Sequence, residues 1–345
     1  MIRTFKCSGC GGDLIYEAGT DHLVCPHCRK TTSFAELKYD TDLKVQAADE
    51  AVDNAGNRKK EYHCVNCGAP LTADDYTAAT FCKHCGSPML IESRFTGDGM
   101  PSRILPFAFD KKQAQTYFKT WKGTGFLTPS SFKSSATMDK VRGEYVPYWL
   151  YDYTAEVSID AEGQRNHVER RGDQETVTTE HFQIQRITEG DYDNVPGNAH
   201  QSLPSDKLSV LEPFDFTALK PFAAPFMAGF YADHFAKDAE ELEPEVREKV
   251  TQDALENAVA AITGYDTVEV EQSKVDVLSV QCEYTMLPVW VLNFNYGGKN
   301  YPLYMNGQSG KIEGELPISK GKLLLIGLIF FVIAFLITFF LGRGL

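Results

Sequence analysis

The stretch CSGCGGDLIYEAGTDHLVCPHC, residues 7–28, is followed by a second version of itself, CVNCGAPLTADDYTAATFCKHC, residues 64–85. In each copy two CxxC pairs are separated by 14 residues, and each cysteine lies 57 positions before its counterpart. A two-residue gap lets one tight turn aim both sulfurs at the same metal ion, and two such turns complete a tetrahedron. The repeat therefore predicts two small, rubredoxin-like zinc ribbons, each with four cysteine ligands.

The ligand sets follow from loop closure, because a 14-residue loop costs less conformational entropy than pairing the cysteines of one copy with those of the other. Four thiolates fill a tetrahedral shell, so we expect structural rather than catalytic Zn²⁺, although iron bound in the rubredoxin manner would use similar spacing. His27, His63 and His84 adjoin the cysteines and are predicted to be surface side chains. One ion is assigned to Cys7, Cys10, Cys25 and Cys28, and the second ion to Cys64, Cys67, Cys82 and Cys85.

The residue after the second cysteine of each pair supports this interpretation. It is Gly11, Gly68 and Gly86 in three of the four pairs, where a positive φ would let backbone N–H groups turn toward the sulfurs. Arg29 takes this place in the fourth pair. A ribbon of about 30 residues buries too little apolar surface to be stable alone, so the metal ion is expected to supply folding energy.

Composition limits the possible partners and compartments. The 345 residues are 43% hydrophobic and carry a formal charge of -13. Residues 1–92, which contain both ribbons, hold 10 Lys plus Arg against 13 Asp plus Glu. Nucleic-acid backbones are bound mainly through Lys and Arg, so a nucleic-acid role is disfavoured. Paired CxxC motifs as metal sites also favour a reducing compartment over disulfide chemistry.

The C-terminus differs in kind from the rest of the chain. Leu323–Leu341 is 19 residues without a charge, and a helix of that length spans about 28 Å, enough for the hydrocarbon core of a bilayer. The N-terminus lacks the apolar segment of a signal peptide. Lys311, Lys320 and Lys322 precede the span and Arg343 follows it, so the positive-inside rule predicts a cytoplasmic body on a single-pass cell-membrane anchor that contacts the lipid bilayer.

Between the ribbons and the anchor, the pattern predicts an α+β domain with a mainly antiparallel sheet. A helix capped by Asp110 is expected, followed by an aromatic strand around Tyr145–Tyr153 and a second helix that starts after Pro244. The acidic run 233–256 is expected to be a solvated helix face, with a basic partner as the alternative. The predicted domains are ribbon 1 at 1–37, a polar linker at 38–60, ribbon 2 at 61–92, the α+β domain at 93–318 and the membrane anchor at 319–345.

Two further features of this domain bear on its function. Pro-x-Trp occurs twice in aromatic strands, at Pro147–Trp149 and Pro288–Trp290, and indicates either core packing or a groove for a peptide or lipid. Cys282 stands apart from the repeat and is predicted to be a buried, inert thiol. GxSxG, Walker and HExxH motifs are missing, and closed metal shells offer no open position, so the chain is not expected to be an enzyme.

The whole chain resembles a bacterial family of tandem TFIIB-type zinc-ribbon proteins with a C-terminal membrane anchor. The resemblance is carried by both ribbons and by ILPFAFDKKQAQTYFKTW, GEYVPYWLYD, EPFDF, MAGFYADHF and LPVWVLNFNYGGKNYPLYMNGQSGKIEG. Members are often encoded beside a phage-shock-protein A homologue and an SPFH (band 7) protein. The resemblance implies a scaffold that recruits such partners to the inner face of the membrane during envelope stress.

Two functions of different classes follow. The first is a membrane-anchored adaptor whose ribbons and α+β domain bind proteins, and it agrees with the acidic charge and the closed metal sites. The second is a membrane-tethered nucleic-acid-binding protein connected with transcription or replication, because zinc ribbons of this type occur in factors of those classes. Oligomeric state and the identity of the partner are not encoded in any recognisable motif.

Overall fold

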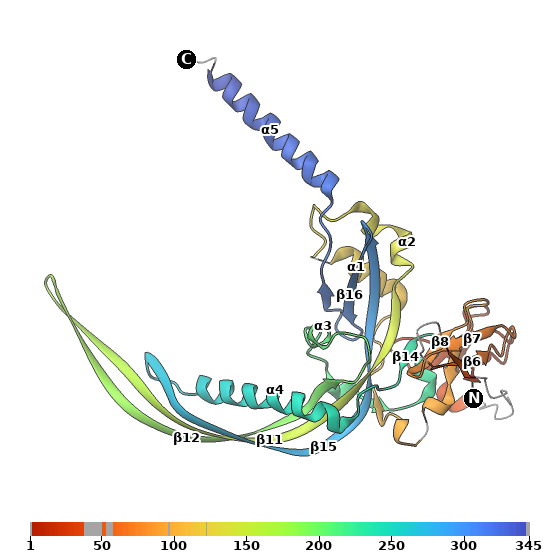
Figure 1. Ribbon diagram of the computed structural model, residues 1–345, viewed down its shortest axis with the longest axis horizontal. Helices are drawn as coiled ribbons and strands as arrows, with labels where there is room; N and C mark the ends of the chain where they lie inside the picture. The colour runs from red at the N-terminus through yellow and green to blue at the C-terminus, as the bar shows by residue number, and fades with distance from the viewer. Residues whose placement is uncertain (1, 38–49, 53–57, 96, 122, 343–345) are drawn as a thin grey trace.

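The computed structural model describes residues 2–37, 50–52, 58–95, 97–121 and 123–342. A compact body contains both cysteine repeats, and two long features leave it (Figure 1). One is the C-terminal helix α5 (Lys320–Gly342), and the other is a curved arm of three long strands with helix α4 (Ala239–Ala260) lying along it. In this view the arm extends from the body to the left and α5 extends upward, and the cysteine repeats lie at the right-hand end of the body.

The central sheet has eleven strands and is mainly antiparallel. Its main path runs β1-β9-β8-β14-β11-β15-β10-β13, with β12 paired to β11, β16 paired to β15, and β17 paired to β16. Two pairs, β10 with β15 and β11 with β14, are parallel, so the sheet is mixed rather than purely antiparallel. The strands that complete the body part of the sheet are β1 (Ile2–Arg3), β8 (Thr77–Phe81), β9 (Pro88–Ile91), β10 (Arg103–Ile104), β13 (Lys220–Pro221), β14 (Tyr231–Asp233), β16 (Lys299–Asn306) and β17 (Ile312–Gly314).

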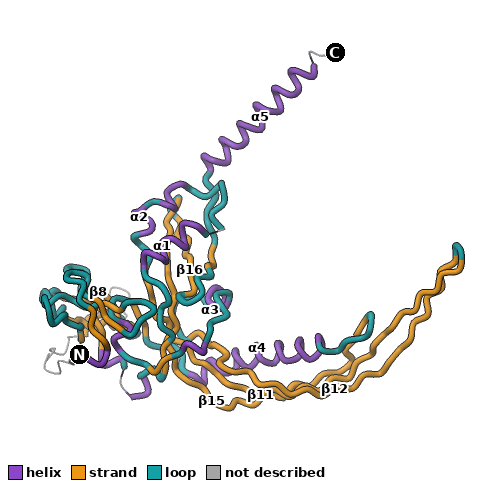
Figure 2. Tube along the Cα trace, turned by 180° about the vertical axis from the view of Figure 1, so that it is seen from behind, coloured by secondary structure: helices purple, strands orange, loops and turns teal. Residues whose placement is uncertain are grey.

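The arm consists of β11 (Arg142–Arg171), β12 (Gln174–Asn198) and β15 (Thr267–Tyr296), as the tube in Figure 2 shows. Its inner face buries alternate β11 side chains, from Tyr151 to Ala161, against Leu242, Val246 and Val250 of α4. The period-two alternation that predicted the aromatic strand is confirmed, since Tyr151 and Tyr153 share this face. The opposite face of the sheet carries no covering helix in the described part of the chain.

The body core is built around aromatic side chains from several elements. Helix α1 (Lys111–Thr120) starts after Asp110 as predicted, and Asp110 caps it by accepting the Gln113 backbone N–H at 2.8 Å. The helix buries Ala114 and Phe118. The rings of Phe107 and Phe230 are stacked at 4.3 Å, and Trp290 approaches the Phe107 ring edge-on at 4.9 Å. Two short helices, α2 (Ser135–Met138) and α3 (Ser205–Ser209), complete the body.

The cysteine repeats are joined to this body by shared sheets and core. The first repeat contains β2 (Ile15–Tyr16), β3 (His22–Val24) and β4 (Thr31–Ser33), and Tyr16 of β2 packs in the same core as Phe230. Strands β8 and β9 of the second repeat extend the central sheet, so the sheet crosses the domain boundary predicted at residue 92. Strand β1 lies before the first repeat yet pairs with β9 of the second.

The segment predicted as a polar linker, residues 38–60, is only partly described. Residues 38–49 and 53–57 lie outside the described residues, but β5 (Glu50–Val52) pairs with β6 (Arg58–His63), which in turn pairs with β7 (Pro70–Ala73), in a three-stranded sheet. The second ribbon is therefore larger than the predicted range 61–92. Charged side chains fill most of β6 and leave no apolar periodicity, so the strand pattern could not be predicted from the sequence.

The expectation that the second helix starts after Pro244 is wrong. Helix α4 begins at Ala239, five residues before Pro244, after the cap Asp238, whose carboxylate accepts the Glu241 backbone N–H at 2.8 Å. Pro244 is tolerated inside because only one backbone hydrogen bond is lost close to the helix start. The segment before α4 forms a 3-10 turn, Ala224–Met227, and strand β14.

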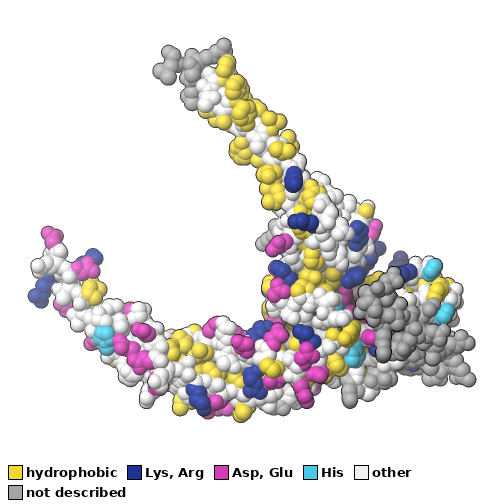
Figure 3. All heavy atoms as spheres, viewed as in Figure 1, with side chains coloured by type: hydrophobic (Ala, Val, Ile, Leu, Met, Phe, Trp, Pro, Cys, Tyr) yellow, Lys and Arg dark blue, Asp and Glu magenta, His cyan; other side chains and the backbone are white. Residues whose placement is uncertain are grey.

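Helix α5 stands away from the body with its apolar side chains exposed, as the yellow surface in Figure 3 shows. Its window Lys320–Phe339 has a mean hydropathy of 2.7 and is 0% buried, so within the described chain it is not a core helix. The helix is long and apolar enough to cross a membrane, in agreement with the predicted span.

Candidate metal centres

The eight cysteines of the repeat lie in two groups of four, as predicted. Within each group all four sulfurs lie within 4.8 Å of one another. The first cysteine of each CxxC pair is buried in the core of its module and the second is exposed, so each cluster sits at the edge of a packed module. The two groups are Cys7, Cys10, Cys25 and Cys28, and Cys64, Cys67, Cys82 and Cys85.

Each CxxC pair is held by the same backbone turn. The N–H of the residue after the second cysteine donates to the carbonyl of the first cysteine at 2.8–2.9 Å in all four pairs. That residue has a positive φ each time, between 61° and 74°, and this confirms the expectation for the three glycines. Arg29, at φ 61°, adopts the same turn although a positive φ is unfavourable for a residue with a side chain. Other interactions of the turn must offset this conformational free energy.

The sulfur spacing fits a tetrahedral metal site. The closest Sγ–Sγ distances are 3.4 and 3.5 Å in the first cluster and 3.6 and 3.7 Å in the second. Tetrahedral Zn–S bonds of about 2.3 Å would place the sulfurs about 3.8 Å apart, whereas a disulfide needs about 2.05 Å. Each cluster could therefore hold one ion with little movement. The same four-thiolate geometry suits iron, so the spacing does not choose between the two metals.

The electrostatics of the thiols favour a bound cation. The Gly9 amide N–H, which lies 3.4 Å from Cys7 Sγ, lowers the pKa of Cys7 to about 6. Hydrogen bonding with Ser87 lowers the pKa of Cys85 to about 6 as well. Burial instead raises the pKa of Cys64 to about 12, and the pKa of Cys10 in the first cluster is also raised to about 12. Each cluster thus combines a thiol with a lowered pKa and one with a raised pKa, and a divalent cation would favour the thiolate form of both.

The remaining candidates from the sequence fall outside these clusters. His27, His63 and His84 are exposed and belong to neither group of possible ligands. The expectation that Cys282 is a buried thiol is wrong, because it lies in β15 at a position where its side chain is exposed. Cys282 lies opposite Tyr151 and two residues from Tyr284, so by alternation it shares their sheet face, but its own side chain is left uncovered there.

A third group, Glu144, His200 and Asp233, was not anticipated from the sequence, because its members come from three separate segments without a common motif. His200 Nε2 lies 2.9 Å from Asp233 and 3.3 Å from Glu144. Its Nδ1 accepts the backbone N–H groups of Ser202 and Leu203 at 3.0 and 3.1 Å. A nitrogen that accepts two N–H donors carries no proton, so Nε2 must carry the ring proton.

This tautomer makes the third group a poor metal site. A metal needs the Nε2 lone pair, and metal-binding histidines normally donate from the other nitrogen instead of accepting there. Burial on its own lowers the pKa of His200, but the two carboxylates outweigh burial and raise the pKa to about 9. A second ring proton would nevertheless have to sit on Nδ1, where it would break the two backbone hydrogen bonds. We therefore assign a neutral ring whose N–H faces two carboxylates and ties β11, β14 and the segment after β12 together.

Comparison with known proteins identifies a relative of similar length. The chain is 32% identical over 322 residues to "Uncharacterized protein YdjG" of Bacillus subtilis (strain 168), an alignment that covers 93% of this chain and 92% of YdjG. No family model matches the chain. No solved structure matches it significantly.

Proposed function

Since the chain belongs to the same protein family as YdjG of Bacillus subtilis, we propose from its own geometry that it is a membrane-anchored adaptor that faces the cytosol and gathers protein partners at the inner membrane. The observation that carries this proposal is the separation of an apolar anchor helix from a long, uncovered sheet face on the same molecule (Figure 1). The two metal ions are proposed to be Zn²⁺ with a structural role, because four sulfurs leave no open position for a substrate. The proposal assigns no catalytic activity.

The body end next to α5 has the character of a membrane-facing surface. Ser319 N–H donates to the Leu127 carbonyl at 2.8 Å and Lys322 Nζ donates to the Thr128 carbonyl at 2.7 Å, so the start of α5 is tied to the loop after α1. On this loop the Phe126 side chain is 74% exposed, and Lys322 Nζ lies 5.8 Å from its ring centre. An exposed aromatic ring and a lysine at the start of an apolar helix suit the interface between headgroups and hydrocarbon.

Orientation is proposed from charge. Lys311, Lys320 and Lys322 lie on the body side of the span, whereas Arg343 follows it. The positive-inside rule then places the body in the cytoplasm, where thiols remain reduced and free to bind metal.

The proposed docking surface is the outer face of the arm, the sheet face opposite α4. Its acidic side chains outnumber its cations, of which Lys274 is the clearest, and they surround two exposed apolar side chains, Ile187 at 73% and Leu278 at 69% exposure. A basic partner with an apolar stripe would complement this face. The acidic side chains are Glu156, Asp160, Glu162, Glu189, Asp191, Glu269, Glu271 and Asp276.

We propose a phage-shock-protein A homologue and an SPFH (band 7) protein as partners, in envelope stress, on the strength of the family resemblance in the sequence. A nucleic-acid partner is not favoured, because the outer face and the chain as a whole are acidic and would repel phosphates.

Neutralising the outer face tests the adaptor role. The triple variant Glu156→Gln, Asp160→Asn and Glu189→Gln removes three acidic groups from that face, and we expect co-purification of partners from solubilised membranes to fall at least roughly tenfold. The matched control removes three acidic groups from the exposed side of α4 with Glu245→Gln, Glu248→Gln and Asp253→Asn and should purify with the same partners as wild type. Equal recovery with both variants would move the docking surface elsewhere, and loss with the α4 variant alone would assign it to α4.

A further inference from the structure

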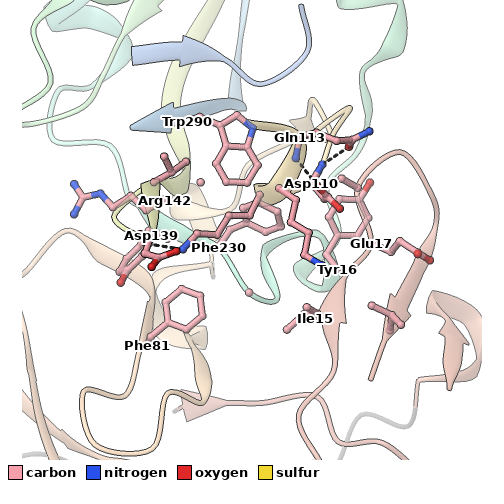
Figure 4. Close-up of a pocket in the computed structure, with 18 of the residues that line it drawn as sticks. Ile15, Tyr16, Glu17, Phe81, Asp110, Gln113, Asp139, Arg142, Phe230 and Trp290 are labelled. Atoms are coloured by element: carbon pink, nitrogen blue, oxygen red, sulfur yellow. Dashed lines mark hydrogen bonds between the residues drawn. The ribbon is translucent and has the colours of Figure 1, made fainter. Parts of the chain in front are cut away.

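A cavity of roughly 740 Å³ lies where the two cysteine modules meet the α+β body (Figure 4). Its walls come from distant parts of the sequence: Tyr16 from the first module, Phe81 from the second, Phe230 from the loop before β14, and Trp290 from β15. The volume is in the range of small-molecule sites, and the aromatic walls supply apolar contact area. The cavity does not overlap the metal clusters or the outer face of the arm, so what it binds is independent of the adaptor role.

The rim of the cavity carries more cations than carboxylates. It is lined by Arg29, Lys111, Lys112, Lys140 and Arg142 against Glu17, Asp110 and Asp139. The side-chain amines of Lys112 and Lys140 make no ion pair or hydrogen bond that is evident among the described residues. Lys111 and Lys112 occupy the first two positions of α1, where the helix dipole is positive and cations are unfavourable. The Asp110 carboxylate caps this helix start by accepting the Gln113 backbone N–H at 2.8 Å, and the two lysines together leave a net positive charge beside it.

One polar atom in the aromatic wall points independently to a ligand. Trp290 is 2% exposed, and its Nε1 is buried without a hydrogen-bond partner among the described residues. A buried indole N–H normally finds an acceptor, because leaving it unpaired costs free energy. In Figure 4 the nitrogen of the Trp290 ring is on the side of Asp110 and Gln113, and the ring centre of Phe109, the residue before Asp110, lies 6.5 Å from that of Trp290. A ligand oxygen held at the helix start could accept this N–H.

We propose that this cavity binds a small organic anion that combines an aromatic or similarly flat apolar group with a carboxylate, sulfonate or phosphate group. The apolar group packs among Tyr16, Phe81 and Phe230, and the anionic group lies at the start of α1 near Lys112. Because Tyr16 and Phe81 belong to the two metal modules, the site is complete only when both modules are folded. Ligand occupancy is thereby coupled to the metal content of the chain.

Naphthalene-2-sulfonate is a suitable probe, and 2-naphthalenemethanol is its neutral analogue. With the full chain in nanodiscs and empty nanodiscs subtracted, we expect saturable binding of the sulfonate at one site per chain and binding of the alcohol at least roughly tenfold weaker. Lys112→Glu should weaken sulfonate binding about tenfold, because it reverses one charge at the site. Trp290→Phe should weaken it severalfold through loss of one hydrogen bond.

The matched control is Lys119→Glu, which makes the same charge change on the exposed last turn of α1, away from the cavity. It should bind the sulfonate within about twofold of wild type. Two bound metal ions and an unchanged melting temperature verify folding of each variant. The proposal is overturned if wild type shows no saturable binding, if the alcohol binds as well as the sulfonate, or if Lys112→Glu and Lys119→Glu bind alike.

Discussion

Cys67→Ser is expected to lower the metal content of the purified chain from two ions to one. Cys67 is an exposed member of the second cluster, so its replacement removes one proposed metal ligand and very little core packing. Structural zinc contributes an apparent free energy of about 10–16 kcal/mol in small Cys- and His-rich peptides, and three remaining ligands would retain only part of it. Elemental analysis and native mass spectrometry of the full-length chain measure the change directly.

The same substitution should destabilise more than one module. Strands β8 and β9 of the second module belong to the central sheet, and β8 pairs with β14. Loss of the metal is therefore expected to lower the melting temperature of the body by roughly 10 °C or more, rather than to release an isolated ribbon. Cys282→Ser is the matched control, because Cys282 is also exposed but lies outside both clusters. Two ions in Cys67→Ser, or one ion in Cys282→Ser, would contradict the ligand assignment.

Ending the chain at Ile318 is expected to move the protein from the carbonate-washed membrane pellet to the supernatant. The removed span holds 19 uncharged residues, of which 16 are Leu, Ile, Phe or Val, and their insertion is worth on the order of 5–10 kcal/mol. Ser319 and Lys322 are tied to the body by hydrogen bonds to the carbonyls of Leu127 and Thr128, which lie on a surface loop, so the body should stay folded without them. Membrane fractionation with the metal content as a folding check measures the outcome.

A full-length pair of variants separates membrane insertion from other effects of truncation. Phe331→Lys with Ala334→Lys places two charges near the middle of the span, each costing about 2.5–3.5 kcal/mol, and should also release the protein. Phe331→Leu with Ala334→Leu keeps the span apolar and should remain in the pellet. Retention of the 1–318 chain in the pellet would show that membrane association does not depend on α5.

The features that could be predicted from the sequence are those fixed by local chemistry. The two four-cysteine clusters follow from cysteine spacing, the start of α1 from a cap at Asp110, and the span of α5 from a run of apolar residues. Each depends on residues within about 25 positions of one another. The buried inner face of the arm could also be predicted from the sequence, because Tyr151 and Tyr153 alternate with less buried side chains.

Non-local arrangements could not be predicted in this way. The pairing of β1 with β9 and of β8 with β14 depends on tertiary contacts. The ribbons were therefore expected to be separate from the body, whereas the second contributes strands to its sheet and the first packs Tyr16 in its core. Strand β11 is largely exposed and polar beyond Gln164, so its sequence pattern predicts only a short strand and not one of 30 residues. The cavity and the Glu144–His200–Asp233 group likewise combine distant segments.

The adaptor role is tested most directly by photo-crosslinking in living cells from the outer face of the arm. A benzophenone amino acid replaces Ile187, which is 73% exposed on that face, and the control position is Val210, which is 42% exposed on the body. The account predicts discrete protein adducts from position 187 in the full-length chain, few from position 210, and loss of the position-187 adducts in a chain that ends at Ile318. Absence of adducts from position 187, or the same adducts from both positions, would contradict it.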